Sequence, residues 1–178
     1  MSGDTTRDRL LASFGPDDAA AGIKSVVPFV TTIVLSLFML LPVGTGLGGA
    51  ALPHLTLISV FYFLSRRPLT MPYSLCAVSG LLLDLWLDVP LGLNMLLMVL
   101  TRLFVVNQLK YYKGRSRFLH WGVFAFLSFG LFTISYVLMS FGANGFLPLA
   151  PVALQWLVTA LSYGPVGFIL GRIRRLMM

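Results

Sequence analysis

Six long apolar runs occupy most of this chain, and they constrain its fold more than any other feature. Hydropathy predicts helices over residues 23–42, 52–65, 69–87, 90–109, 119–141 and 152–171. Of the 178 residues, 57% are hydrophobic and 11% are charged, whereas about a quarter of the residues of a soluble domain are charged. So few charges could not cover that much apolar surface in water. The sequence therefore predicts an all-α membrane protein with six transmembrane helices.

Only short turns separate the runs, which leaves no room for a soluble domain between them. We expect a polar tail over residues 1–22, one transmembrane domain over 23–172 and a basic segment over 173–178. The second run is short for a spanning helix, so it is expected to begin earlier, to tilt, or to be partly buried by protein. The single cysteine, Cys76, excludes an intramolecular disulfide and a multi-cysteine metal site.

The positions of the 13 Lys and Arg residues predict the orientation. All except Arg102 lie before or at the very start of the first run, or follow the second, fourth and sixth runs, which is one side of the membrane if there are six crossings. The positive-inside rule then places both termini in the cytoplasm. The net charge of +7 is therefore expected to set orientation and to contact anionic lipids, rather than to bind nucleic acid. The basic residues of the two inner loops are Arg66, Arg67, Lys110, Lys113, Arg115 and Arg117.

The loop "KYYKGRSR" at 110–117 has a second interpretation. Its cluster of basic residues between apolar runs is typical of cytoplasmic loops in general. The same cluster could dock a cytoplasmic partner. The sequence favours the first interpretation, because such loops are basic by default.

Two aspartates interrupt the apolar stretch 80–94. Asp88 is expected at the outer boundary, as a turn residue beside Pro90. Asp84 lies one helical turn deeper, roughly 6 Å, on a line of small or polar positions. Such a line packs against another helix in membranes, so Asp84 should face protein rather than lipid. The other positions of this line are Gly80, Cys76 and Pro72.

The next run returns antiparallel after Pro90 and Gly92, which brings Asn94 to the depth of Asp84. We therefore expect the two side chains to form a hydrogen bond. Arg102 shares the face of Asn94 but lies about two turns, roughly 12 Å, nearer the cytoplasm, so an ion pair with Asp84 would require tilt. Two interpretations stay open. The polar set marks an ion path or a docking site for a partner's helix, or it is a structural bond with Arg102 reaching the headgroups.

The motif "GLLLD" at 80–84, followed by "PLGLN" at 90–94 and preceded by "RRP" at 66–68, resembles the signature of the bacterial rod-shape-determining MreD family. The similarity is sharpest over residues 66–97, and elsewhere it rests on size, span count and topology. The polar N-terminal tail is longer than in that family. The residues that carry the resemblance around the hairpin are Gly80, Asp84, Pro90, Gly92 and Asn94.

The resemblance implies a non-enzymatic scaffold of the cell-elongation machinery, which synthesises peptidoglycan, in the bacterial inner membrane. Its expected direct partner is the bitopic protein MreC. Through MreC it would be linked to MreB and to the polymerase RodA with its transpeptidase partner. The resemblance also implies a fold similar to the substrate-binding subunits of energy-coupling-factor vitamin transporters, an analogy of fold alone.

No pattern typical of catalysis accompanies these features. The sequence lacks HExxH, GxSxG and a Gly-rich phosphate loop. His54 and His120 fall in different runs, on opposite membrane sides in the expected topology, so they are expected to pack near the interfaces. We therefore predict no catalytic residue, no metal site and no cofactor.

Two other functions are compatible with the sequence. The first is the substrate-binding subunit of a small-molecule transporter, with an outward pocket near Asp84, Asn94 and Trp86. The second is a proton-coupled channel that uses Asp84 and Arg102, although one acid and one base at different depths make a poor relay. Either function would need these polar groups to face water or ligand.

Several residues predict helix packing. Gly167 and Gly171 are four apart and favour a close helix crossing, and Pro165 predicts a kink in the same run. Three tryptophans near predicted interfaces are typical of membrane anchors. They are Trp86, Trp121 and Trp156.

Overall fold

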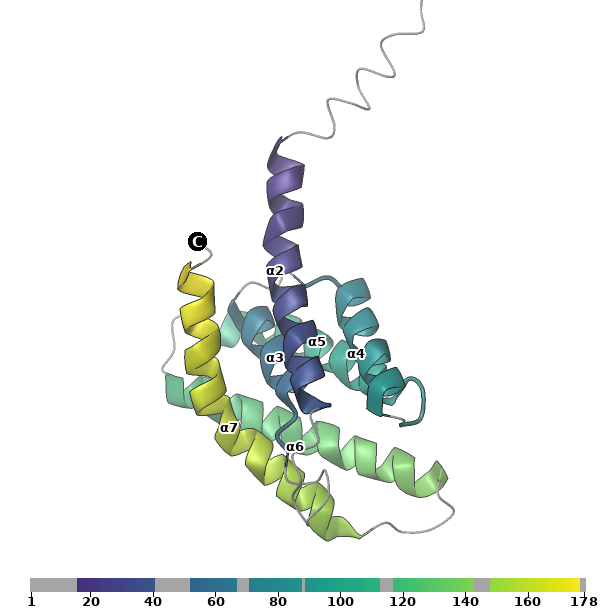
Figure 1. Cartoon of the computed structure of the whole chain (residues 1–178). Coiled ribbons are helices and arrows are strands. Elements are labelled where there is room, and N and C mark those ends of the chain that lie inside the picture. Colours follow the sequence, from purple (N-terminus) through teal and green to yellow (C-terminus); the bar gives the residue numbers. More distant parts are fainter. Residues whose placement is uncertain are drawn as a thin grey trace, which may run out of the picture.

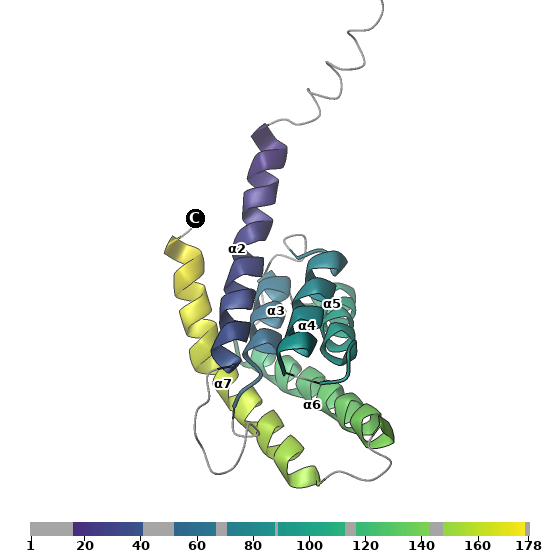
Figure 2. The same ribbon diagram turned by 45° about the vertical axis from the view of Figure 1, so that its right-hand side comes forward.

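Every regular element in the described part of the chain is a helix. The computed structural model describes residues 16–40, 52–66, 71–87, 89–112, 117–142 and 148–176. Helices α2 to α5 lie beside one another, while α6 passes obliquely across them next to a bent α7 (Figures 1 and 2). Within these residues the helices are α2 (Pro16–Met39), α3 (Leu55–Arg66), α4 (Tyr73–Leu87), α5 (Leu93–Tyr112), α6 (Arg117–Gly142) and α7 (Leu149–Leu176).

Helix α3 lies at the centre of the fold. Every residue from Leu55 to Leu64 is buried, and α3 contacts α2, α5 and α7. Its 12 residues make about 18 Å of helix, well short of the roughly 30 Å of a hydrocarbon core. Other helices of the chain cover its apolar side chains. Of the three options for the short second run, burial by protein is therefore the one that the structure shows.

Two of the described helices are long and apolar enough to cross a membrane. These segments are Phe118–Gly142 in α6 and Leu149–Arg172 in α7. These two helices give weak support for membrane association, and because the other apolar segments are shorter, six crossings stay a prediction. The shorter segments are Pro28–Met39, Leu55–Arg66, Tyr73–Leu87 and Leu93–Gln108.

Two pairs of buried hydroxyl groups join α2 to α3. Thr32 Oγ1 lies 2.9 Å from Ser59 Oγ, and Ser36 Oγ lies 2.7 Å from Thr56 Oγ1. Thr32 already donates its proton to the carbonyl of Pro28 at 2.7 Å, so Ser59 is the donor in the first pair. Interhelical bonds of this kind contribute about 0.6 kcal/mol each in membrane proteins. They fix which face of α2 meets α3.

Two tryptophans connect α6 to α7. Trp121 donates its indole N–H to the carbonyl of Ala160 at 2.9 Å, and Trp156 donates to the carbonyl of Ala125 at 3.2 Å. The two bonds are reciprocal, one from each helix. Their polar edges are therefore used between helices, whereas the sequence alone predicted anchoring to the membrane interface.

Helix α7 crosses α3 closely through two glycines. An added Cβ at Gly171 would lie 3.1 Å from the hydroxyl of Tyr62, and one at Gly167 would lie 3.9 Å from its ring. The predicted close crossing is thus made within this chain. Pro165 lies inside α7, and the helix bends along its length (Figure 1).

Candidate functional site

Among the described glycines, Gly80 makes the closest helix contact, which lies between α4 and α5. A Cβ built on Gly80 would come within 2.5 Å of Met95 Cα and 2.6 Å of the Asn94 carbonyl oxygen. Real Cβ atoms do not approach backbone so closely, so no larger residue fits unless the helices separate. Gly80 therefore lets the first turn of α5 lie directly against α4.

This close approach brings the carboxylate of Asp84 to the start of α5. Asp84 Oδ1 accepts a hydrogen bond from the backbone N–H of Asn94 at 2.8 Å. Its Oδ2 accepts from the N–H of Gly92 at 2.9 Å and from that of Met95 at 3.3 Å. Both oxygens are thus bonded to the backbone of the next helix, and the side chain is only 1% exposed.

The turn that precedes α5 explains why a carboxylate is needed there. Gly92 has a φ of 97°, a conformation that favours glycine, and its carbonyl accepts the first bond of α5 from Leu96 at 2.9 Å. It occupies the N-cap position, where Ser, Thr, Asp or Asn would normally bond the free N–H groups of the first turn. Glycine has no side chain for this, and Asp84 supplies the missing acceptor from α4. Its negative charge also suits the positive end of the helix dipole.

Pro90 completes the turn. Its carbonyl accepts a hydrogen bond from Leu93 at 3.1 Å, which closes the residues just before α5. The proline ring fixes φ and thus lowers the number of conformations open to the turn before folding.

The expected bond between the side chains of Asp84 and Asn94 is wrong. Asp84 binds the backbone N–H of Asn94, while Asn94 Oδ1 lies 3.1 Å from Nε2 of His54. The physical reason is the burial of the α5 start, because its free N–H groups compete for the carboxylate and use both oxygens. The Asn94 side chain turns instead toward α3 and is 4% exposed.

His54 connects this site to two further helices. Its Nδ1 accepts from the backbone N–H of Leu57 at 3.3 Å, so Nδ1 carries no proton and the neutral ring donates from Nε2 to Asn94. The His54 carbonyl accepts from Ile58 at 3.2 Å, so His54 is itself the N-cap of α3. Its own N–H donates to Thr159 Oγ1 of α7 at 3.0 Å.

We call His54, Asp84, Asn94 and Thr159 the helix-end cluster. It joins α3, α4, α5 and α7 through hydrogen bonds in which each polar side chain has a partner within the chain. The sequence placed His54 near the interface and missed its role. A signal was present, because a polar residue after Pro53 and directly before an apolar run occupies an N-cap position.

Arg102 lies at the other end of the α4–α5 hairpin. Its guanidinium carbon lies 4.4 Å from the ring centroid of Tyr73, the first residue of α4, in a cation–π contact. Tyr73 and Asp84 are eleven positions apart on one helix, or roughly 16 Å. The structure thus does not bring Arg102 to the helix-end cluster.

The basic residues of the two loops predicted to be cytoplasmic are only partly described. Arg66 is exposed in the last turn of α3, with its guanidinium carbon 5.8 Å from the ring centroid of Tyr62. Lys110 lies in α5, and Arg117 begins α6. The predictions for Arg67, Lys113 and Arg115, and for the turn residue Asp88, lie outside the described residues.

Among the described residues, no group of three or more His, Cys, Asp or Glu side chains is placed to hold a metal ion. Comparison of the chain with protein-family models, with curated proteins and with solved structures gave no match.

Substitution of His54 separates its two roles. His54→Asn keeps an N-cap acceptor for α3 but is too short to reach Asn94, so we expect a loss of about 1 kcal/mol from the unpaired Asn94 side chain. His54→Leu removes the cap and leaves buried polar groups unpaired, which is expected to cost about 2 kcal/mol. Thermal unfolding in detergent measures both variants. Equal stability of His54→Leu and the unchanged chain would contradict this role.

Proposed function

We propose that this chain is a non-catalytic, multi-pass membrane scaffold of the MreD type. The observation that supports this most is that the buried polar side chains of the helix-end cluster form their hydrogen bonds within the chain. Asp84 accepts three backbone N–H bonds, and Asn94 bonds His54. Polar side chains bonded in this way stabilise the fold and are not open to a substrate. This favours a structural role, such as that of a scaffold, over binding of a small molecule.

The proposal includes six crossings, with both termini in the cytoplasm of a bacterial inner membrane. Hydropathy and the one-sided distribution of Lys and Arg favour it. The start of α2 and the end of α7 point toward the same end of the bundle, in keeping with an even number of crossings (Figure 1). The short helix α3 would then cross the membrane in contact with protein rather than with lipid.

The proposed partner is MreC, and through it MreB and RodA with its transpeptidase. The α4–α5 hairpin is the part of the chain most suited to hold a partner's single helix, because it is fixed at one end by Asp84. Its α4 face carries exposed apolar side chains that no described helix covers. These are Val78, Leu81 and Leu85.

The alternative of a transporter subunit has less support. It would need Asp84 and Asn94 to face an open outward site, yet these side chains are 1% and 4% exposed and bonded to their own chain. A proton relay between Asp84 and Arg102 is disfavoured by their positions at opposite ends of the hairpin.

Gentle purification from the host membranes, followed by native mass spectrometry, tests the proposal. We expect a co-purifying protein with one span and a large periplasmic portion. A photoreactive amino acid at Leu85 should crosslink to it, whereas the same group at the exposed Leu157 of α7 should not. A small-molecule adduct with no protein partner would contradict the proposal and favour the transporter subunit.

A further inference from the structure

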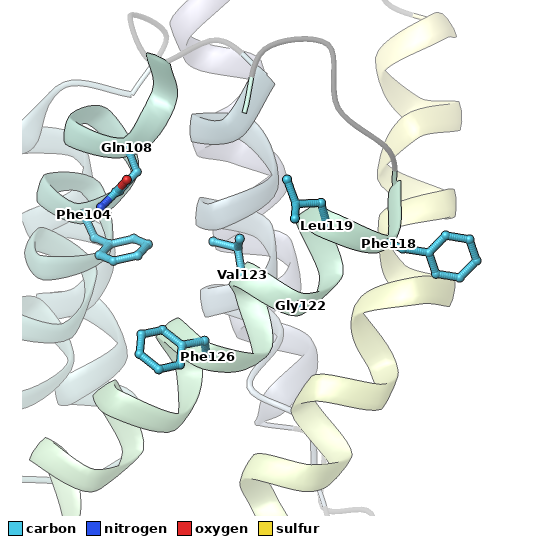
Figure 3. Close-up of a pocket in the computed structure, with 7 residues that line it drawn as sticks. All are labelled: Phe104, Gln108, Phe118, Leu119, Gly122, Val123 and Phe126. Carbon is cyan, nitrogen blue, oxygen red and sulfur yellow. The ribbon is translucent and has the colours of Figure 1, made fainter. Parts of the chain in front are cut away.

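An open groove lies between α5 and α6. It consists of two adjoining cavities of about 410 and 420 Å³, both lined by Phe104 and Gln108 of α5 and by Phe126 of α6. Figure 3 shows Phe104 and Phe126 on either side of this space, with Gln108 toward one end. The walls are otherwise apolar except for Asn107. The groove is thus an open apolar surface with two amides.

The length of the groove decides what kind of molecule fits it. Its lining extends from Leu100 to Gln108 on α5 and from Phe118 to Ile134 on α6. At 1.5 Å per residue these stretches are about 12 Å and 24 Å long, so the part with a wall on both sides is limited to about 12 Å by α5. One leaflet occupies half of the roughly 30 Å hydrocarbon core, so this two-walled part matches one acyl chain. A partner's transmembrane helix would need the full thickness.

The charge near the polar end indicates the headgroup. The amides of Asn107 and Gln108 lie near the end of α5, and the sequence from 110 to 117, which leads into α6, carries four basic residues and no acid. An anionic headgroup is complementary to this sign. A spanning partner oriented by the positive-inside rule would instead bring its own basic residues to the same level.

We propose that the α5–α6 groove binds one acyl chain of an anionic phospholipid, with the headgroup at the Asn107 and Gln108 end. The inference rests on the membrane embedding in the proposed function, but not on its protein partner. The basic loops predict contact with anionic lipids without a defined site. The proposal places this contact at the α5–α6 groove. Amide N–H groups at that end can donate to the ester and phosphate oxygens.

The test uses the purified full chain in phosphatidylcholine vesicles that contain a minor fraction of phosphatidylglycerol with a photoreactive acyl chain. Matched vesicles carry the same reactive chain on phosphatidylcholine, and labelled peptides are identified by mass spectrometry. We expect groove residues to be labelled about fivefold more by phosphatidylglycerol, the factor that one basic residue near an anionic headgroup contributes. Equal labelling by the two lipids would overturn the proposal.

Two glycines in the groove allow a variant that fills it. A Cβ at Gly122 or Gly130 meets nothing within 4 Å, so the double variant Gly122→Leu/Gly130→Leu should fold, and labelling of the groove residues should be lost as the space closes. Gly164→Leu on α7 has equal room and is the control, with unchanged labelling. Persistent labelling in the double variant would overturn the proposal.

The lipid preference of the unchanged chain decides the question even if the double variant does not fold. Co-flotation with vesicles reports insertion separately, and no protein partner is present. Loss of the lipid preference would therefore leave MreC binding untouched, and loss of MreC binding would leave the lipid preference untouched.

Discussion

Gly80→Ala is expected to destabilise the folded chain by about 3 kcal/mol, the upper end of the usual cost of overpacking. The added methyl group would lie 2.5 Å from Met95 Cα and 2.6 Å from both Met95 N and the Asn94 carbonyl oxygen. These are backbone atoms, which cannot rotate away as a flexible side chain can. The first turn of α5 must move, and the hydrogen bonds that Asp84 makes to it lengthen.

The matched control is Gly122→Ala on α6. A Cβ at this position meets nothing within 4 Å, and alanine is favoured over glycine inside a helix by about 1 kcal/mol. The same chemical change should therefore lower the unfolding midpoint at Gly80 and leave it unchanged or raise it at Gly122. Thermal unfolding in detergent, followed by circular dichroism, measures both. A Gly80→Ala variant as stable as the unchanged chain would show that the α4–α5 contact is looser than described.

Asp84→Leu is expected to cost about 3 kcal/mol, because it removes the acceptor for the buried N–H groups of Gly92, Asn94 and Met95. Asp84→Asn should cost roughly half as much. Its single carbonyl oxygen can still accept bonds, but its NH₂ group faces backbone donors and accepts none. The favourable interaction with the α5 dipole is also lost in both variants.

The two Asp84 variants also test the scaffold proposal. If the hairpin positions the surface that meets MreC, recovery of the partner in a pull-down should fall in the order unchanged chain, Asp84→Asn, Asp84→Leu. Thermal unfolding of the same samples shows whether partner recovery falls because the hairpin is altered or because the whole protein is unfolded. Wild-type-like recovery and stability in both variants would refute the role of Asp84 as the cap of α5.

The helical class and the direction of Asp84 could be predicted, because both depend on local periodicity. Long apolar runs separated by short turns predict helices. The line of small positions through Gly80 places Asp84 toward a neighbouring helix. The described elements are all helices, and the carboxylate of Asp84 in α4 reaches the start of α5. The count of six crossings stays a prediction, since two described helices are long and apolar enough by themselves.

The identity of each hydrogen-bond partner could not be predicted in the same way. The His54–Asn94 bond joins residues 40 positions apart, and hydropathy carries no signal for such a pair. The expected Asp84–Asn94 pair failed because only the side chains were considered. The backbone N–H groups at a buried helix start are also donors that require partners, and Gly92 at the N-cap leaves them without a local one.

The bond from the N–H of His54 to Thr159 spans 105 positions, which bears on the order in which the chain assembles. During synthesis α3 emerges long before α7, so this N–H has no protein acceptor until the last helix has been inserted. The α4–α5 hairpin, by contrast, completes its bonds over a few residues and can form as soon as α5 is made. Biogenesis should therefore proceed from an early hairpin to a late closure at the helix ends, with α7 as the final element that stabilises the start of α3.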